Sequence, residues 1–181
     1  MKITFLGASS TLIEIGGKRI LVDAGMRPSP KVRWGLAGDQ LPNLSQIDSI
    51  GSVDAILITH AHADHTGALE LVTGRFSDTP VYATPPTIAL TRILHQDSWR
   101  VMQTRLDEEG ELSLIDDVAV QRLMSAFVPV PFNNRQSLGE GLIATFFSAG
   151  HIAGAAMLGL ESSEGHCYLW DAVGFLWQGK D

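Results

Sequence analysis

Apolar positions along the chain predict an alternation of strands and helices. Short apolar runs at residues 3–6, 11–15 and 19–22, with the turn Gly16-Gly17 between the last two, predict an antiparallel meander. Residues 26–52 carry many prolines and glycines, which predicts a long loop with a short helix at most. Beyond it the pattern predicts strands at 54–58, 81–83, 142–147, 156–161 and 166–170, and helices that begin at Gly67, span 86–106 and run from Asp116 to about residue 126.

Composition indicates a globular domain. The 181 residues are 45% hydrophobic and 18% charged, enough for one core that buries about two thirds of the unfolded surface. No run approaches the ~20 apolar residues that a membrane-spanning helix needs, so we expect no membrane association. Cys167 is the only cysteine, which excludes an internal disulfide and predicts a cytoplasmic protein with this thiol in its core.

The chain is acidic, with a net charge of −7. Nucleic-acid binding draws much of its affinity from the neutralisation of phosphates, and the basic residues here form no run. We therefore expect weak affinity for RNA or DNA from this chain alone.

The densest chemistry lies directly after the apolar run at residues 55–58. Three histidines and an aspartate fall within six positions, at His60, His62, Asp64 and His65. Ligand sites of open α/β sheets lie at this end of a strand, and imidazole and carboxylate suit zinc. The alternative is a polar surface loop that happens to carry histidines, but their crowding beside an aspartate favours a metal site.

The segment His60-Ala-His62-Ala-Asp64-His65 resembles the HxHxDH signature of the metallo-β-lactamase-fold hydrolases. Residues 20–25 resemble the early strand of that family, whose aspartate, here Asp23, supports the metal loop. Residues 147–156 contain a GHxxGxA stretch around His151 that resembles the β-CASP branch, the RNA- and DNA-processing nucleases. The resemblance implies an α/β fold, the metallo-β-lactamase-type αββα sandwich, of which this chain covers the N-terminal half with a mixed β-sheet flanked by helices.

The same resemblance implies a set of site residues. Zn²⁺ is the implied cofactor, as one or two ions, with Mn²⁺ or Fe²⁺ also open. One ion would be held by His60, His62 and His151, and the second by Asp64 and His65, with Asp171 as the bridge between them. Asp64 and Asp23 are the implied catalytic residues, Asp23 by orienting the ligand loop. The residues before Asp171 are Leu169-Trp170, where the family has Ser-Gly, and this departure puts the bridge geometry in question.

The chain also departs from the family after Asp171, where ten residues follow. The resemblance implies one truncated metallo-β-lactamase-like domain over residues 1–181, without the β-CASP clamp domain or the C-terminal half. That half would supply the last histidine of the second metal site, so we expect this site to be partly occupied or empty. The apolar end with Trp170 and Trp177 predicts a homodimer or a completing partner chain.

Three functions stay open on the sequence. The first is a β-CASP-type RNA or DNA phosphodiesterase that uses a zinc-bound hydroxide, weak or incomplete in this short chain. The second is a small-molecule hydrolase of esters or thioesters, and the third is an inactive metal-binding half-domain. The two remaining histidines carry no metal prediction, since His95 is expected on a solvated helix face and His166 is expected to be exposed.

Overall fold

The computed structural model describes residues 1–27, 41–109, 116–170 and 174–179. Its first sheet has six strands in the order β1-β2-β3-β4-β5-β6. The first three strands are antiparallel and the last three run parallel to β3. The strands are β1 (Lys2–Gly7), β2 (Ser10–Ile15), β3 (Lys18–Val22), β4 (Ala55–Leu57), β5 (Val81–Ala83) and β6 (Phe127–Pro129).

The second sheet has five strands, all antiparallel, in the order β11-β10-β9-β8-β7. They are β7 (Arg135–Ser137), β8 (Ile143–Ser148), β9 (Ala156–Ser162), β10 (Gly165–Trp170) and β11 (Gly174–Gly179). The described helices are α1 (Leu44–Ile50), α2 (Ala63–Thr66), α3 (Leu69–Arg75), α4 (Pro85–Glu109) and α5 (Asp117–Ala126).

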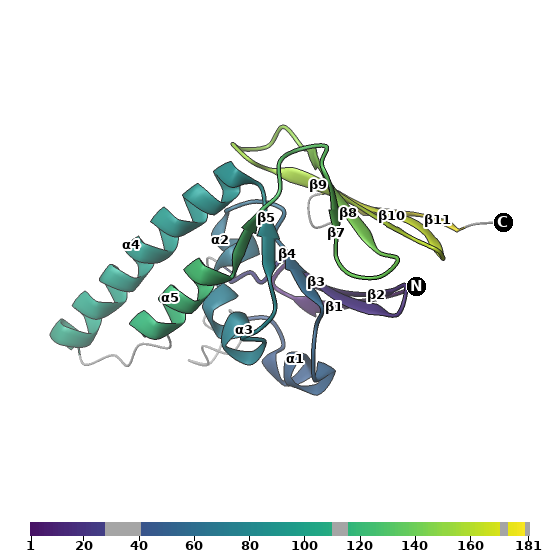
Figure 1. Ribbon diagram of the computed structural model, residues 1–181. Coiled ribbons are helices and arrows are strands. Elements are labelled where there is room, and N and C mark those ends of the chain that lie inside the picture. The colour runs from purple at the N-terminus through teal and green to yellow at the C-terminus, as the bar shows by residue number, and fades with distance from the viewer. Residues whose placement is uncertain (28–40, 110–115, 171–173, 180–181) are drawn as a thin grey trace.

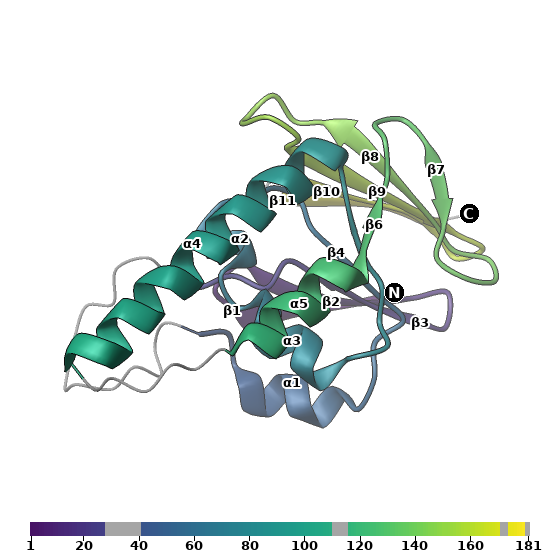
Figure 2. The same cartoon turned by 60° about the vertical axis from the view of Figure 1, so that its left-hand side comes forward.

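Three layers result, with helices α1, α3, α4 and α5 on one face of the first sheet and the second sheet on its other face (Figures 1 and 2). Strand β4 explains this order, because Ile56 packs among the helices whereas Ala55 and Leu57 pack against the second sheet. Successive side chains of a strand point to opposite faces, so a strand that is apolar at every position is buried on both. In the part of the chain that is described, helices cover the first sheet only, which gives an α/β/β arrangement.

The structure confirms the predicted fold class and most of the predicted elements. Asp116 caps α5 as expected, with its carboxylate accepting the backbone N–H of Ala119 at 2.7 Å. The helix expected from Gly67 begins at Leu69 as α3, and the short helix α2, which ends at Thr66, was not predicted. Strands β6, β7 and β11 were not predicted; β6 and β7 have three residues each, too few for a period-two pattern.

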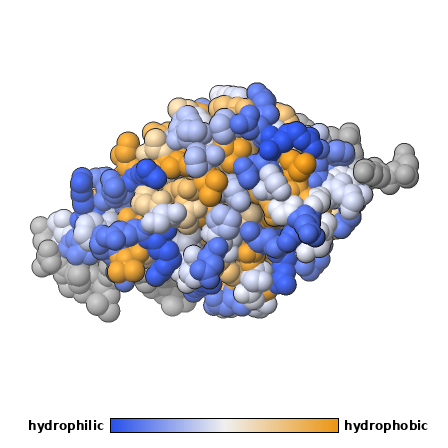
Figure 3. Space-filling model, in the orientation of Figure 1, coloured by the Kyte–Doolittle hydropathy of each residue, from blue (hydrophilic) through white to orange (hydrophobic). Residues whose placement is uncertain are grey.

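No described helix is both long and apolar enough to cross a lipid bilayer. Apolar patches interrupt the polar surface over the side formed by α4 and α5 (Figure 3), where Ile93, Leu94 and Val101 are exposed.

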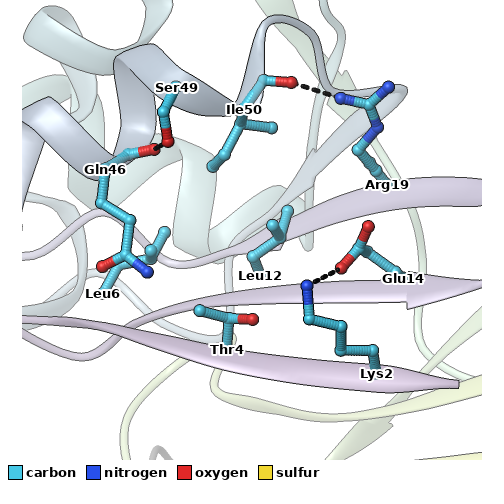
Figure 4. A pocket seen from close by; sticks show the side chains of 9 residues that line it. All are labelled: Lys2, Thr4, Leu6, Leu12, Glu14, Arg19, Gln46, Ser49 and Ile50. Atoms are coloured by element: carbon cyan, nitrogen blue, oxygen red, sulfur yellow. Dashed lines mark hydrogen bonds and ion pairs between the residues drawn. The ribbon is translucent and has the colours of Figure 1, made fainter.

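A pocket of about 250 Å³ opens between α1 and the first three strands (Figure 4). Its charged side chains already have partners, since Lys2 pairs with Glu14 and Arg19 donates to the carbonyl of Ile50. None of the histidines lines this pocket.

Candidate metal centre

The histidine-rich loop begins where β4 ends. Thr59, the first residue of this loop to carry a polar side chain, is buried, as are His60 and His65, whereas His62 is exposed. The backbone N–H of Ile58 still pairs with the carbonyl of Tyr82 in β5, so the sheet fixes the strand up to the residue before the loop. The sequence prediction of a site at this strand end therefore has a rigid base in the structure.

Three imidazole rings converge beside this loop. His60 Nε2 lies 3.1 Å from His62 Nδ1, and His151 Nε2 lies 3.3 Å from the same atom. All three ligand atoms lie within 4.8 Å of one another. Ligands at the usual Zn–N distance of about 2.0–2.1 Å in a tetrahedral site are separated by about 3.3 Å, so two of the three spacings fit an ion without rearrangement. These three histidines are therefore positioned to hold one divalent metal ion.

Asp23 supports the loop from the end of β3. Its side chain is fully buried and accepts three hydrogen bonds: from the Thr59 N–H at 2.8 Å, from the Thr59 hydroxyl at 2.7 Å and from His65 Nδ1 at 2.7 Å. A buried carboxylate is stable only when its oxygens have such donors. Asp23 thus ties the loop to the sheet without itself facing the three converging histidines.

The same hydrogen bonds indicate which nitrogen of each ring carries a proton. An ionised carboxylate only accepts, so Thr59 and His65 Nδ1 must donate to Asp23. The Thr59 oxygen, 3.1 Å from His60 Nδ1, is then left to accept the proton of that nitrogen. In its neutral form each ring then carries its proton on Nδ1 and has a lone pair on Nε2, which is the state that a metal ligand requires.

Backbone contacts hold the two loops edge to edge. Ala24 N–H donates to the carbonyl of His65 and Met26 N–H to that of Ala63, each at 2.8 Å. Gly25 lies between them, and a Cβ there would be 1.6 Å from the carbonyl oxygen of Asp64. Only glycine permits this approach, which explains the Asp23-Ala-Gly25 sequence.

Asp64 and His65 face one another beside the three-histidine cluster. Asp64 Oδ2 lies 3.8 Å from His65 Nε2, and the Asp64 side chain is half exposed while that of His65 is buried. Among the described residues no third potential ligand joins this pair, so the second metal site expected at Asp64 and His65 stays a prediction. Asp171, the expected bridge, lies outside the described residues.

His151 comes from the loop between β8 and β9. The loop is closed by Ala149 N–H, which donates to the carbonyl of Ala155 at 2.9 Å. Ala156 N–H donates to the carbonyl of Thr59 at 2.9 Å, which joins this loop to the one that carries His60 and His62. Segments about 90 residues apart in the sequence thus meet at one point through backbone bonds.

Two expectations about the other histidines were wrong. His95 is buried, and its Nδ1 hydrogen-bonds the buried carboxylate of Glu70 on α3. The side chains of Thr87, Thr91 and His95 follow at intervals of four along α4, so they share the face that packs against the molecule. His166 is half-buried, because β10 lies between β9 and β11 and neighbouring strands flank its side chain.

The role of Thr59 was missed, although the sequence carried a signal for it. A hydroxyl residue stands directly before the first histidine and after the apolar strand, where it can reach both a carboxylate and a ring nitrogen.

Cys167 is buried in the core as predicted, and burial raises the pKa of its thiol to about 11.

Several known proteins are similar to this chain in sequence. Integrator complex subunit 11 of Danio rerio is 32% identical over 94% of this chain and 29% of its own length. Endoribonuclease YSH1 of Mycosarcoma maydis is 34% identical over 86% of this chain and 17% of its own, and transcription termination factor FttA of Methanosarcina mazei is 28% identical over 88% and 24%. The chain thus spans less than a third of these relatives, which confirm the resemblance to the β-CASP branch.

Solved structures and a family profile agree on the fold. A subclass B3 metallo-beta-lactamase from a soil metagenome library, MEM-A1, superposes with a TM-score of 0.54 at 19% identity, over 88% of this chain and 54% of its own. Residues 3–174 match the profile of the metallo-beta-lactamase superfamily. The chain belongs to the metallo-β-lactamase superfamily.

Proposed function

We propose that this chain is a metal-dependent hydrolase that acts on RNA phosphodiester bonds. The observation that carries the proposal is the convergence of His60 Nε2, His62 Nδ1 and His151 Nε2 within 4.8 Å of one another, with two of the three spacings near the tetrahedral value. Further support comes from relatives that include an endoribonuclease. The donor set of three neutral imidazoles fits Zn²⁺ best, and Mn²⁺ or Fe²⁺ would compete according to availability.

Within this proposal each residue has a part in the chemistry. His60, His62 and His151 would hold one divalent ion, Asp64 and His65 would be ligands of a second, and Asp171 would bridge the two. Such an ion supplies Lewis acidity, which lowers the pKa of water and withdraws charge from a phosphoryl oxygen. Asp64 is half exposed beside the cluster, which supports a role for its carboxylate in taking up a proton from the attacking water. Asp23 acts on the reaction through Thr59 and His65, by keeping their donors and acceptors in one arrangement.

The activity of this chain alone is expected to be weak. A net charge of −7 opposes the approach of a polyanion, and neutralised phosphates are the main source of RNA affinity. An incomplete second metal site would also remove stabilisation of one of the reacting oxygens, and one lost transition-state donor costs about 10²–10³ in rate.

Cleavage of an end-labelled single-stranded RNA, with and without chelator, tests the proposal. The wild type should cleave slowly, chelator should abolish cleavage, and His60→Ala should be inactive. His166→Ala is the matched control, since it removes a half-buried histidine outside the metal cluster. Chelator-resistant cleavage, or equal rates for His60→Ala and wild type, would contradict the proposal.

Parallel substrates separate the alternatives. Hydrolysis of bis(p-nitrophenyl) phosphate together with RNA supports a phosphodiesterase, whereas hydrolysis of p-nitrophenyl acetate alone identifies a small-molecule esterase. Metal binding without turnover of any of the three identifies an inactive metal-binding half-domain.

Two proposals on organisation accompany this one. The described residues belong to one metallo-β-lactamase-like domain, and a second copy or a partner chain covers its exposed apolar surface. Exposed apolar residues on α4, such as Ile93 at 63% exposure, support association. Light scattering of the purified chain should give at least twice the monomer mass of 19.6 kDa, or a monomer that pairs only with another chain.

A further inference from the structure

Two threonines at the start of α4 hydrogen-bond the loop that carries His151. Thr84 follows β5 directly and precedes Pro85, the first residue of α4. The hydroxyl of Thr84 donates to the carbonyl of Gly154 at 2.7 Å, and the hydroxyl of Thr87 donates to the same oxygen at 2.9 Å. Both threonines are fully buried, so neither bond competes with water. A carbonyl oxygen has two lone pairs, and here one hydroxyl occupies each.

The backbone at Gly154 is shaped for this contact. Its φ is +85°, and an added Cβ would lie 2.5 Å from Thr87 N and 2.7 Å from each threonine Oγ1. Any side chain at this position would therefore displace the hydroxyls. The second glycine of the GHxxGxA stretch is explained by the close approach of α4, because no other residue could stand there.

Few residues separate these two hydrogen bonds from the proposed metal ligand His151. Ala155 N–H donates to the carbonyl of Ile152 at 3.0 Å, so residues 152–155 form a tight turn directly after His151. Of the bonds described above, the closure at Ala149 joins the loop only to itself, and the bond at Ala156 lies beyond its end. Among the described residues, these two hydroxyl bonds and the contact between the His151 and His62 rings are the side-chain bonds that tie the inside of the loop to the rest of the molecule.

The helix that holds the loop is itself fixed to the other metal loop. Three turns into α4, His95 bonds Glu70 on α3, the helix that follows His65. The first turn of α4 therefore contacts the His151 loop, and its third turn contacts the helix behind the HxHxDH loop. Movement of α4 would change the distance between His151 and the pair His60 and His62.

We propose that Thr84 and Thr87 are positioning residues that place His151 for metal binding by fixing the carbonyl of Gly154. This inference rests on the proposed function, because it assumes that the three histidines bind a metal ion. The threonines touch neither metal nor substrate, so their effect should appear in metal affinity and in the order of the loop. Partners behind a metal ligand typically contribute a factor of about 10–100 to affinity.

Isosteric substitution isolates the hydroxyl bonds. The double variant Thr84→Val, Thr87→Val keeps the shape of both side chains and removes both donors. Thr84→Ser, Thr87→Ser keeps the donors and serves as the rescue. Thr91→Val is the matched control, since Thr91 is also a fully buried threonine on α4 but its hydroxyl has no hydrogen-bond partner among the described residues.

Two measurements read out the result, Zn²⁺ affinity by competition with a chromophoric chelator and hydrogen exchange of the amides at 149, 155 and 156 in metal-free protein. The double valine variant should bind Zn²⁺ about 10–100-fold more weakly and exchange these amides faster. The serine pair and Thr91→Val should match the wild type in both. If the double variant does not fold, Thr87→Val alone retains one bond and should show a smaller loss of the same kind.

The outcomes distinguish this inference from the function beneath it. Wild-type affinity and wild-type exchange in a folded valine variant would overturn the role of the threonines and leave the metal site standing. A wild type that binds no metal would overturn the proposed function and the placement of His151 for metal with it. Equal loss in the serine pair would also overturn the inference, because the effect would then follow packing and not the hydroxyls.

Discussion

Replacing Asp23 by asparagine changes the charge at the base of the metal loop and almost nothing of its shape. The amide oxygen can still accept the Thr59 N–H that now bonds Oδ1 at 2.8 Å. The amide nitrogen then faces the Thr59 hydroxyl and His65 Nδ1, both of which now donate to Oδ2 at 2.7 Å. An amide nitrogen can only donate, so both of these groups must become acceptors or lose the bond.

Two effects of Asp23→Asn follow from this geometry. Hydrogen bonds to a charged group contribute about 1.5–3 kcal/mol each, and reversed neutral bonds recover part of that, so the metal-free protein should lose about 2–4 kcal/mol of unfolding free energy. If His65 Nδ1 becomes an acceptor, the proton moves to Nε2, the nitrogen that faces Asp64. The Thr59 hydroxyl, which lies 3.1 Å from His60 Nδ1 and orients that ring, must also turn, so Zn²⁺ affinity should fall by about 10–100-fold.

Urea unfolding in chelator and Zn²⁺ titration measure these effects separately. Asp54→Asn is the matched control, because the Asp54 carboxylate also accepts a backbone N–H, from Arg19 at 2.8 Å, but lies outside the site. The control should bind Zn²⁺ like the wild type. An Asp23→Asn protein more stable than wild type would refute the reasoning, since the buried carboxylate would then cost more than its bonds return.

Three further predictions concern groups outside the metal loop. His95→Ala should lower unfolding free energy by about 3–5 kcal/mol, because the buried carboxylate of Glu70 loses its partner, whereas the double change of both residues to leucine should recover most of the loss; equal losses in urea unfolding would contradict this. Cys167, whose buried thiol has a pKa of about 11, should react far more slowly with a thiol reagent at pH 8 in native protein than in urea, and comparable rates would show that it is accessible. Burial raises the pKa of Asp54, but hydrogen bonds from a backbone N–H and a lysine ammonium lower it by more. The net effect is a pKa below the ordinary value of an aspartate. Its contribution to stability is therefore complete above the unfolded value and is lost as pH falls through the folded one, so Asp54→Asn should flatten the acid limb of a stability profile, and an unchanged limb would exclude the ion pair as its cause.

Most strands of the fold could be predicted from the sequence because their apolar positions are strongly patterned. Residues 55–58 are apolar at every position, which is typical of a strand buried on both faces, and β4 proved to be one. The HxHxDH spacing placed the metal loop correctly for a related reason, since polar ligands directly after such a strand have few other uses.

What the sequence did not show depends on tertiary contacts. His95 stands among polar helix residues, and nothing local indicates that α3 brings a carboxylate to it. Thr84 and Thr87 resemble ordinary residues at the start of a helix, because the carbonyl that they bind belongs to a loop about 70 residues later. Such roles follow from the packing of elements distant in sequence, which no local pattern encodes.

The central claim, that His60, His62 and His151 form a metal site, is tested most directly by metal content. Elemental analysis of dialysed wild type, His62→Ala and His166→Ala should find at least one divalent ion per chain in the first and third proteins and almost none in the second. His62 was chosen because its Nδ1 is the atom within 3.3 Å of both other ligand nitrogens. A His62→Ala protein that keeps the metal content of the wild type would contradict the account.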